Sequence, residues 1–235
     1  MLWFHSACEN SDFHGTGDTI TEVRHCSSFH SVTISDNIET HFHFNNIGES
    51  SRIEVIGGDK LLPKINTSVV DSVLTISNEN TWNWIRSYEK SKIIMNIYTN
   101  PISSVKYDGY ADVVFHDTLF IPSFSFESTG GMGNIYLKVY NDSCFVGAHT
   151  GSPAIYIDGR CKELYLFTHS HGLINATNLT TDNGFVHSKG TADCYISPLI
   201  TLGVTLEYIG NAYYKNNPVI LWLSEQHHGK LIKID

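Results

Sequence analysis

Residues 105–115 read VKYDGYADVVF, which is two apolar segments joined by a kink of small residues. The same arrangement returns at 126–137 (FESTGGMGNIYL), 147–157 (GAHTGSPAIYI), 166–176 (LFTHSHGLINA), 186–196 (VHSKGTADCYI) and 206–216 (LEYIGNAYYKN). The kinks centre on Gly109, Gly131, Gly151, Ser170, Gly190 and Gly210, with spacings of 22, 20, 19, 20 and 20 residues. A unit that recurs at a nearly constant spacing indicates a repeat architecture.

The period near 20, with apolar alternation inside each unit, predicts an all-β, right-handed parallel β-solenoid with two main sheets. Successive turns then stack about 4.8 Å apart, which explains why apolar residues persist at equivalent positions of each unit. Each turn needs a sharp corner, formed either with a positive φ or without a Cβ. The predicted structural turn residues are Gly109, Gly131, Gly151, Gly172, Gly190 and Gly210. An antiparallel sandwich of hairpins is the alternative, but hairpins do not require a constant period.

Composition supports this class and sets limits on function. The 235 residues are 41% hydrophobic and only 17% charged, with a net charge of −9 and no cluster of cations, which argues against a nucleic-acid partner. No apolar run reaches the length of a membrane-spanning helix. We expect a tail at 1–18 and one solenoid domain at 19–235, with 19–101 as an irregular N-terminal half or cap and 102–235 as the regular repeats.

Three segments before the repeats carry a family resemblance: VRHCSSFHSVTISDNIETHF (23–42), DKLLPKINTSVVDSVLTIS (59–77) and IIMNIYTNPISSVKYDGYADV (93–113). Together with the later Gly-x-small kinks, they resemble the head GIN domain family of auto-transporter adhesins over about residues 19–232. The resemblance implies a pectin-lyase-like β-helix, often on a lipoprotein exported across a Gram-negative inner membrane. It also implies a role in cell adhesion and no shared catalytic set. This chain departs from the family's Gly-Ser-Gly kinks with bulkier variants such as DGYAD, HSHGL and IGNAY.

The N-terminal segment MLWFHSAC places two small residues before Cys8 and resembles the end of a bacterial lipoprotein signal. Its apolar part is short, and His5 stands where an aliphatic residue is usual. We predict lipidation at Cys8 and an exported envelope protein, on the outer membrane or cell surface, that meets the membrane only through that anchor. A free cysteine on a disordered tail is the alternative. The other cysteines match no zinc or redox spacing and are predicted to be small core residues, with a disulfide left open: Cys26, Cys144, Cys161 and Cys194.

Thirteen histidines raise the question of a metal. His41 and His43 share one strand face, and His149, His169, His171 and His187 lie near the kinks, but at different offsets from them. Solvated turn histidines are therefore favoured, and no metal or cofactor is predicted. Asp108 and Asp112 share one turn, yet no acidic column forms of the kind that a polysaccharide lyase would need. There is no G-x-S-x-G or H-E-x-x-H motif, so we predict no enzyme activity.

Two sets of residues are candidate ligand contacts. Trp82, Trp84 and Tyr88 form an aromatic group in a predicted loop, and Tyr107, His149 and Tyr208 belong to a predicted polar column with Thr129, Thr168 and Ser188. These residues favour a non-enzymatic adhesion module that binds a glycan or a protein. A structural or sensing module that docks another protein of the same cell is the alternative, and a polysaccharide-active enzyme is less favoured. PVILWLS (218–224) is either the last turn or an edge buried in a homo-oligomer.

Overall fold

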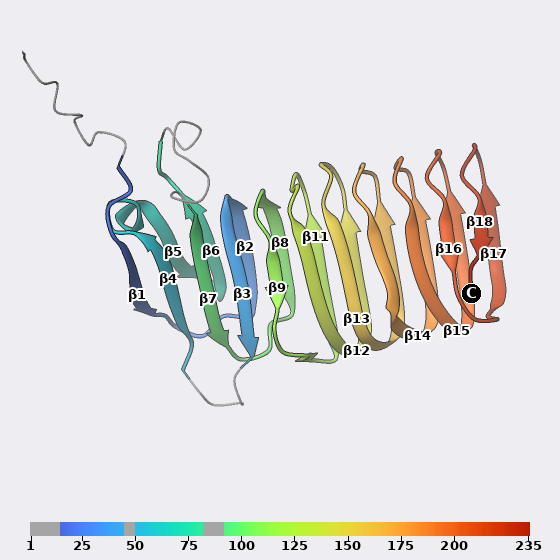
Figure 1. The fold of residues 1–235 in the computed structure, drawn as a ribbon. Coiled ribbons are helices and arrows are strands. Elements are labelled where there is room, and N and C mark those ends of the chain that lie inside the picture. Colours follow the sequence, from blue (N-terminus) through green and yellow to red (C-terminus); the bar gives the residue numbers. More distant parts are fainter. Residues whose placement is uncertain (1–14, 45–49, 82–91) are drawn as a thin grey trace, which may run out of the picture.

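The computed structural model describes residues 15–44, 50–81 and 92–235 as a row of stacked strand turns (Figure 1). Apart from one 3-10 helix, η1 (Leu62–Lys64), every regular element among these residues is a strand. The first strands are β1 (Thr19–His25), β2 (Ser31–Asp36), β3 (Ile38–Phe44), β4 (Arg52–Gly58), β5 (Ile65–Val70), β6 (Val73–Asn78) and β7 (Ile93–Thr99). The strands of the repeats are β8 (Ser104–Gly109), β9 (Val113–Phe115), β10 (Leu119–Phe120), β11 (Ser123–Ser128), β12 (Asn134–Ala148), β13 (Ala154–Thr168), β14 (Ile174–Ser188), β15 (Cys194–Leu206), β16 (Ala212–Tyr214), β17 (Val219–Glu225) and β18 (Leu231–Lys233).

The repeats form the predicted parallel β-solenoid. β12 pairs in parallel with β13, β13 with β14, and β14 with β15, so that Ile135 lies beside Ile155 and Leu166 beside Val186. These partners are 20 residues apart, which confirms the period seen in the sequence. Each turn contributes a first strand segment, such as 134–140, and a second one, such as 143–148, with the apolar core enclosed between them.

The N-terminal half contains both parallel turns and a cap, and its spatial order differs from its chain order. β2 lies between β6 and β8, and β3 lies between β7 and β9, all in parallel register. The turn 31–44 is therefore inserted between the turns 73–99 and 104–115. Beyond them, β1, β4 and β5 add antiparallel pairs that cover this end of the stack (Figure 1). Of these strands, β4 and β5 pair with edges that the parallel turns would otherwise leave open at this end.

One continuous hydrophobic core runs through the whole stack, from Phe29 to Ala212. Each fully buried Leu, Ile, Val or Phe side chain in it stabilises the fold by about 1.5–3 kcal/mol relative to exposure. Cys144, Cys161 and Cys194 are buried members of this core, and like the partly buried Cys26 they are free thiols. Burial raises the pKa of Cys194 to about 12 and that of Cys161 to about 11, so both stay neutral and pack as small apolar side chains.

The kink residues stack directly on one another, and this explains their small size. The Ser152 amide donates to the Gly131 carbonyl, and the Thr191 amide donates to the Ser170 carbonyl. A Cβ at Gly151 would overlap the Gly131 carbonyl oxygen. Of the six predicted turn glycines, Gly151 alone has a positive φ, of 82°. The other five lack a positive φ. At these positions a side chain is excluded because its Cβ would overlap the backbone of the neighbouring turn or the ring of Tyr107.

We predict that Gly151→Ala lowers the free energy of unfolding by about 1–3 kcal/mol, because the new Cβ meets both an unfavourable φ and a carbonyl oxygen. Urea denaturation followed by circular dichroism measures this loss. Gly147→Ala is the matched control, since its Cβ would meet the movable side chains of Phe145 and His149 at 3.0 and 3.2 Å. Equal losses in the two variants would contradict this account of the corner.

Candidate functional site

The polar column predicted from the sequence is out of phase with the structure. Tyr107 pairs with Ser128, and the column continues inward through Ala148, Thr168 and Ser188. Tyr107 is only 1% exposed, and its hydroxyl donates to the Ala111 carbonyl at 2.6 Å. The prediction of Tyr107 as a ligand contact is therefore wrong, and Thr168 and Ser188 are likewise buried.

The corner glycines explain why a tyrosine fits inside. A Cβ at Gly109, Gly131 or Gly133 would overlap the ring or the hydroxyl of Tyr107. The missing side chains leave the space that this ring fills. Tyr107 is thus a core residue that packs against the kinks, and the large rise that burial causes in the pKa of its hydroxyl agrees with that placement.

The other predicted contacts lie on the surface or outside the described residues. His149 is half-exposed, with Nε2 3.1 Å from the Glu127 carboxylate, and Tyr208 is exposed beside His227. Trp82, Trp84, Tyr88 and Cys8 fall outside the described residues. In the part of the chain that the structure describes, no group of three or more His, Cys, Asp or Glu side chains is placed to hold a metal ion.

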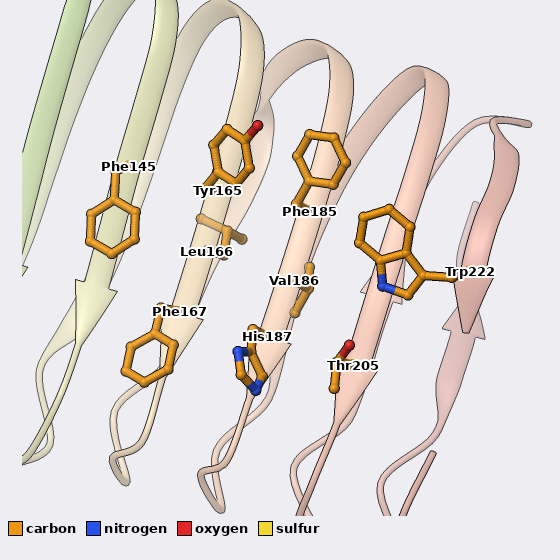
Figure 2. Close-up of a pocket in the computed structure, with 9 residues that line it drawn as sticks. All are labelled: Phe145, Tyr165, Leu166, Phe167, Phe185, Val186, His187, Thr205 and Trp222. Carbon is orange, nitrogen blue, oxygen red and sulfur yellow. The ribbon is translucent and has the colours of Figure 1, made fainter. Parts of the chain in front are cut away.

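A ladder of aromatic rings follows the outer face of the second strand segments. Phe145, Tyr165 and Phe185 are in register on β12, β13 and β14. The rings of Tyr165 and Phe185 stack with their centroids 4.6 Å apart, and Phe185 stacks on Trp222 of β17 at 5.6 Å. Figure 2 shows these four rings side by side across successive turns. The parallel register that aligns the core residues therefore also aligns rings on the outside.

A glycine allows the last ring to join the ladder. Gly203 of β15 lies between Phe185 and Trp222 in this register, which shifts by one residue next to it. A Cβ at Gly203 would overlap the indole of Trp222. The indole therefore lies over β15 and reaches Phe185 across one turn.

A second row beside this ladder completes a groove of about 410 Å³. Two residues further along the strands, Phe167, His187 and Thr205 also face outward (Figure 2). Between the two rows, Leu166 and Val186 turn their side chains into the core. The outcome is an open groove with mainly apolar walls, which suits an apolar or ring-shaped ligand better than a charged one.

A group of polar and charged side chains lies next to one edge of the groove, around His187. His187 Nε2 lies 2.6 Å from the Glu207 carboxylate, and Lys189 Nζ lies 3.2 Å from it. Hydrogen bonds from His187 and Lys189 hold the pKa of Glu207 below its usual range. This edge can orient a polar group of a ligand whose remaining part lies on the rings.

Sequence reasoning missed this groove although part of its signal was present. Phe145, Tyr165 and Phe185 recur at the 20-residue period, so a search for aromatic columns would have found them. Trp222 breaks the period, and its place depends on the register shift beside Gly203.

A different column of rings crosses the first strand segments. The Arg52 guanidinium lies 3.8 Å from the Tyr98 ring centroid, and Tyr98 stacks on His43 at 4.7 Å. His43 stacks on His116 at 4.7 Å with the rings nearly parallel, and Lys138 donates to the His116 carbonyl at 3.2 Å. This column crosses β4, β7, β3, the residue directly after β9, and β12, and it therefore spans the inserted turn 31–44.

His43 and His116 of this column favour the neutral form. His41 Nδ1 and His116 Nε2 share a hydrogen bond of 2.8 Å, and His41 Nε2 lies 3.0 Å from the Glu39 carboxylate. Partial burial lowers the pKa of both His43 and His116. Repulsion from neighbouring imidazoles lowers both further, while the carboxylate of Asp117 opposes the shift.

Comparison with known proteins agrees with this fold. A family model described as "Putative auto-transporter adhesin, head GIN domain" matches residues 28–218. The chain belongs to this family. No curated protein matches the chain by sequence. The head GIN domain assignment supports an adhesin-type protein and names no catalytic residue.

Solved structures show the same fold for the head GIN domain. A "putative adhesin" from Bacteroides fragilis is similar with a TM-score of 0.81 and 19% identity, over 92% of this chain and 97% of that one. A "Putative lipid binding protein" from Parabacteroides distasonis has a TM-score of 0.70 and 14% identity, over 94% and 98% of the two chains. A further "putative adhesin", from Parabacteroides merdae, has a TM-score of 0.62 and 17% identity, over 94% and 98%. Within the described residues, no helix has the length and apolar character needed to cross a membrane.

We predict that this head GIN domain loses stability as the pH falls from about 7 to about 5. The folded pKa values of His43 and His116 lie below those of the unfolded chain, so the unfolded chain binds protons first on acidification. The stabilisation is complete above the unfolded pKa, near 6.5, and is lost as the pH falls toward the lower folded values. Urea midpoints measured across this range test the prediction.

The variant His43→Gln/His116→Gln should flatten this pH dependence. His169→Gln, which changes an exposed histidine outside the column, should keep it. If the urea midpoint of the double variant depends on pH as steeply as that of the wild type, the column is not the source of the pH dependence.

Proposed function

We propose that this chain is a non-enzymatic, exported binding module of a bacterial cell envelope and that it acts as an adhesin. Its membership of the head GIN domain family supports the adhesin class. The observation that carries the proposal is the aromatic groove, which opens on the outer face of a stiff ladder of turns. A groove of this kind gives an apolar or ring-shaped ligand an extended surface to lie on.

The shape of the fold supports a role in adhesion. Parallel turns joined by continuous backbone ladders give a rigid rod, and a rigid display favours binding because little conformational freedom is lost. Weak contacts that are repeated on a cell surface add up through multivalency. The ligands we propose are glycans or proteins, with lipid included because one structural relative is described as a "Putative lipid binding protein".

We predict that Tyr165→Ala weakens ligand binding by about tenfold or more, since a central aromatic contact contributes about 2 kcal/mol. Arrays of glycans, matrix proteins and lipid vesicles, followed by titration of the best binder, measure the effect. Tyr136→Ala is the matched control, because Tyr136 is 42% exposed against 39% for Tyr165 but lies on a first strand segment, away from the groove. An equal effect of both variants, or no effect of Tyr165→Ala, would place the binding surface elsewhere.

We propose further that Cys8 carries a lipid that anchors the module to the membrane. Its sequence context, with small residues ahead of it, supports this. In the native host, the tagged protein should take up a clickable fatty acid, the Cys8→Ala variant should not, and protease added to intact cells should cleave the protein.

The outcome also separates the two candidate roles. Protection of a labelled protein from external protease would favour the alternative module that faces the periplasm and docks a protein of the same cell. A protein found unlabelled in the cytoplasm would contradict export.

A further inference from the structure

The last turn of the stack leaves two strand edges without partners. β17 pairs with β15 and β18 pairs with β16, and among the described strands none pairs with the other edge of either. The side chains of β17 are apolar and exposed from Val219 to Leu223. Unpaired backbone groups beside apolar side chains are a surface that can accept a further strand.

The core itself is open at this end. Leu223 continues the buried column of Val186 and Val204, yet it is 48% exposed where Val204 is 0% exposed. Ile220 continues the column of the buried Leu202 and is exposed as well. These residues occupy core positions that no further strand among the described residues covers.

The opposite end of the stack is protected. Its edge strand, β1, carries the ion pair between Arg24 and Glu22, with Nε 2.9 Å from the carboxylate. Arg24 also donates to Thr67 of β5 at 3.0 Å, which ties the charge into the cap. Residues 216–224 (NNPVILWLS) contain no charged side chain at all. Charged residues on an edge oppose pairing, and the segment 219–224 of β17 offers an edge without them.

We propose that β17 and β18 pair with the same strands of a second copy of this chain, across a twofold axis perpendicular to the sheets. Such an axis reverses strand direction, so β17 meets its copy in antiparallel register and β18 does the same. A twofold interface must complement itself, and the uncharged segment 219–224 of β17 does so because it brings no like charges together. The nearest carboxylate, Glu225, is already paired with Lys230 at 2.8 Å. The second copy covers Leu223 and Ile220 and closes both edges.

Trp222 links this interface to the groove. It forms one end of the aromatic ladder and lies on the strand that meets the second copy (Figure 2). The perpendicular axis places the grooves of both copies on the same face, end to end, with the partner's Trp222 beside this one. The dimer therefore presents a groove of twice the length, which raises avidity for an extended ligand.

Sedimentation velocity of the full chain without ligand, over a range of protein concentrations, tests the proposal. We expect the wild type to sediment with twice the chain mass, and Leu221→Lys to sediment as a folded monomer because it places a charge at the centre of the interface. Val23→Lys is the matched control and should remain a dimer, since Val23 on β1 is 52% exposed against 51% for Leu221. Circular dichroism confirms that both variants are folded.

Hydrogen exchange of the amides at 219–224 identifies what covers the edge. Protection that falls on dilution supports a second copy, whereas protection independent of concentration means that the same chain covers the edge and overturns the proposal. A monomeric wild type, assembly beyond the dimer, a dimer that survives Leu221→Lys, or dissociation by Val23→Lys would also overturn it. The measurement needs no ligand, so its failure leaves the proposed role of the groove intact.

Discussion

The constraint on which this structure depends is the parallel backbone ladder that lays each turn directly on the previous one. Hydrogen bonds such as that from the Ser152 amide to the Gly131 carbonyl bring the corners so close that a Cβ has no room. The small kink residues follow from that distance. So does the place of Tyr107, because the missing side chains of three corner glycines leave the space that its ring fills inside the core.

The same ladder decides the chemistry of the surface. Since residues 20 positions apart lie side by side, any side chain that recurs at this period becomes a row along the stack. On one face this period aligns Phe145, Tyr165 and Phe185 of the aromatic groove. The column of Tyr98, His43 and His116 on the other face has a different origin, because the parallel pairing of β3 between β7 and β9 brings together residues that do not recur at this period. One face is thus apolar and open to a ligand, whereas the other contains imidazoles whose neutral form stabilises the contacts between turns.

Much of the repeat region could be predicted from the sequence, since its strand segments pair with neighbours one period away. The face on which each column lies could not be predicted in the same way. The polar column assigned to Tyr107, Thr168 and Ser188 faces inward, because a shift of one residue along a strand moves a side chain to the other face of the sheet. The groove was partly visible as Phe145, Tyr165 and Phe185. Trp222 was not, since a register shift beside Gly203 brings it into the row.

The sequence by itself determined the solenoid class, the period and the positions of the corners, because these depend on residues that repeat along the chain. Only the tertiary structure decided that the turn 31–44 lies between 73–99 and 104–115, and that β1, β4 and β5 cap one end while β17 leaves the other open. The physical reason is that the alternation of apolar and polar residues along a strand indicates which of its faces is buried. It does not indicate which other strand lies beside it. That choice depends on the competition among all edges for hydrogen bonds and apolar cover.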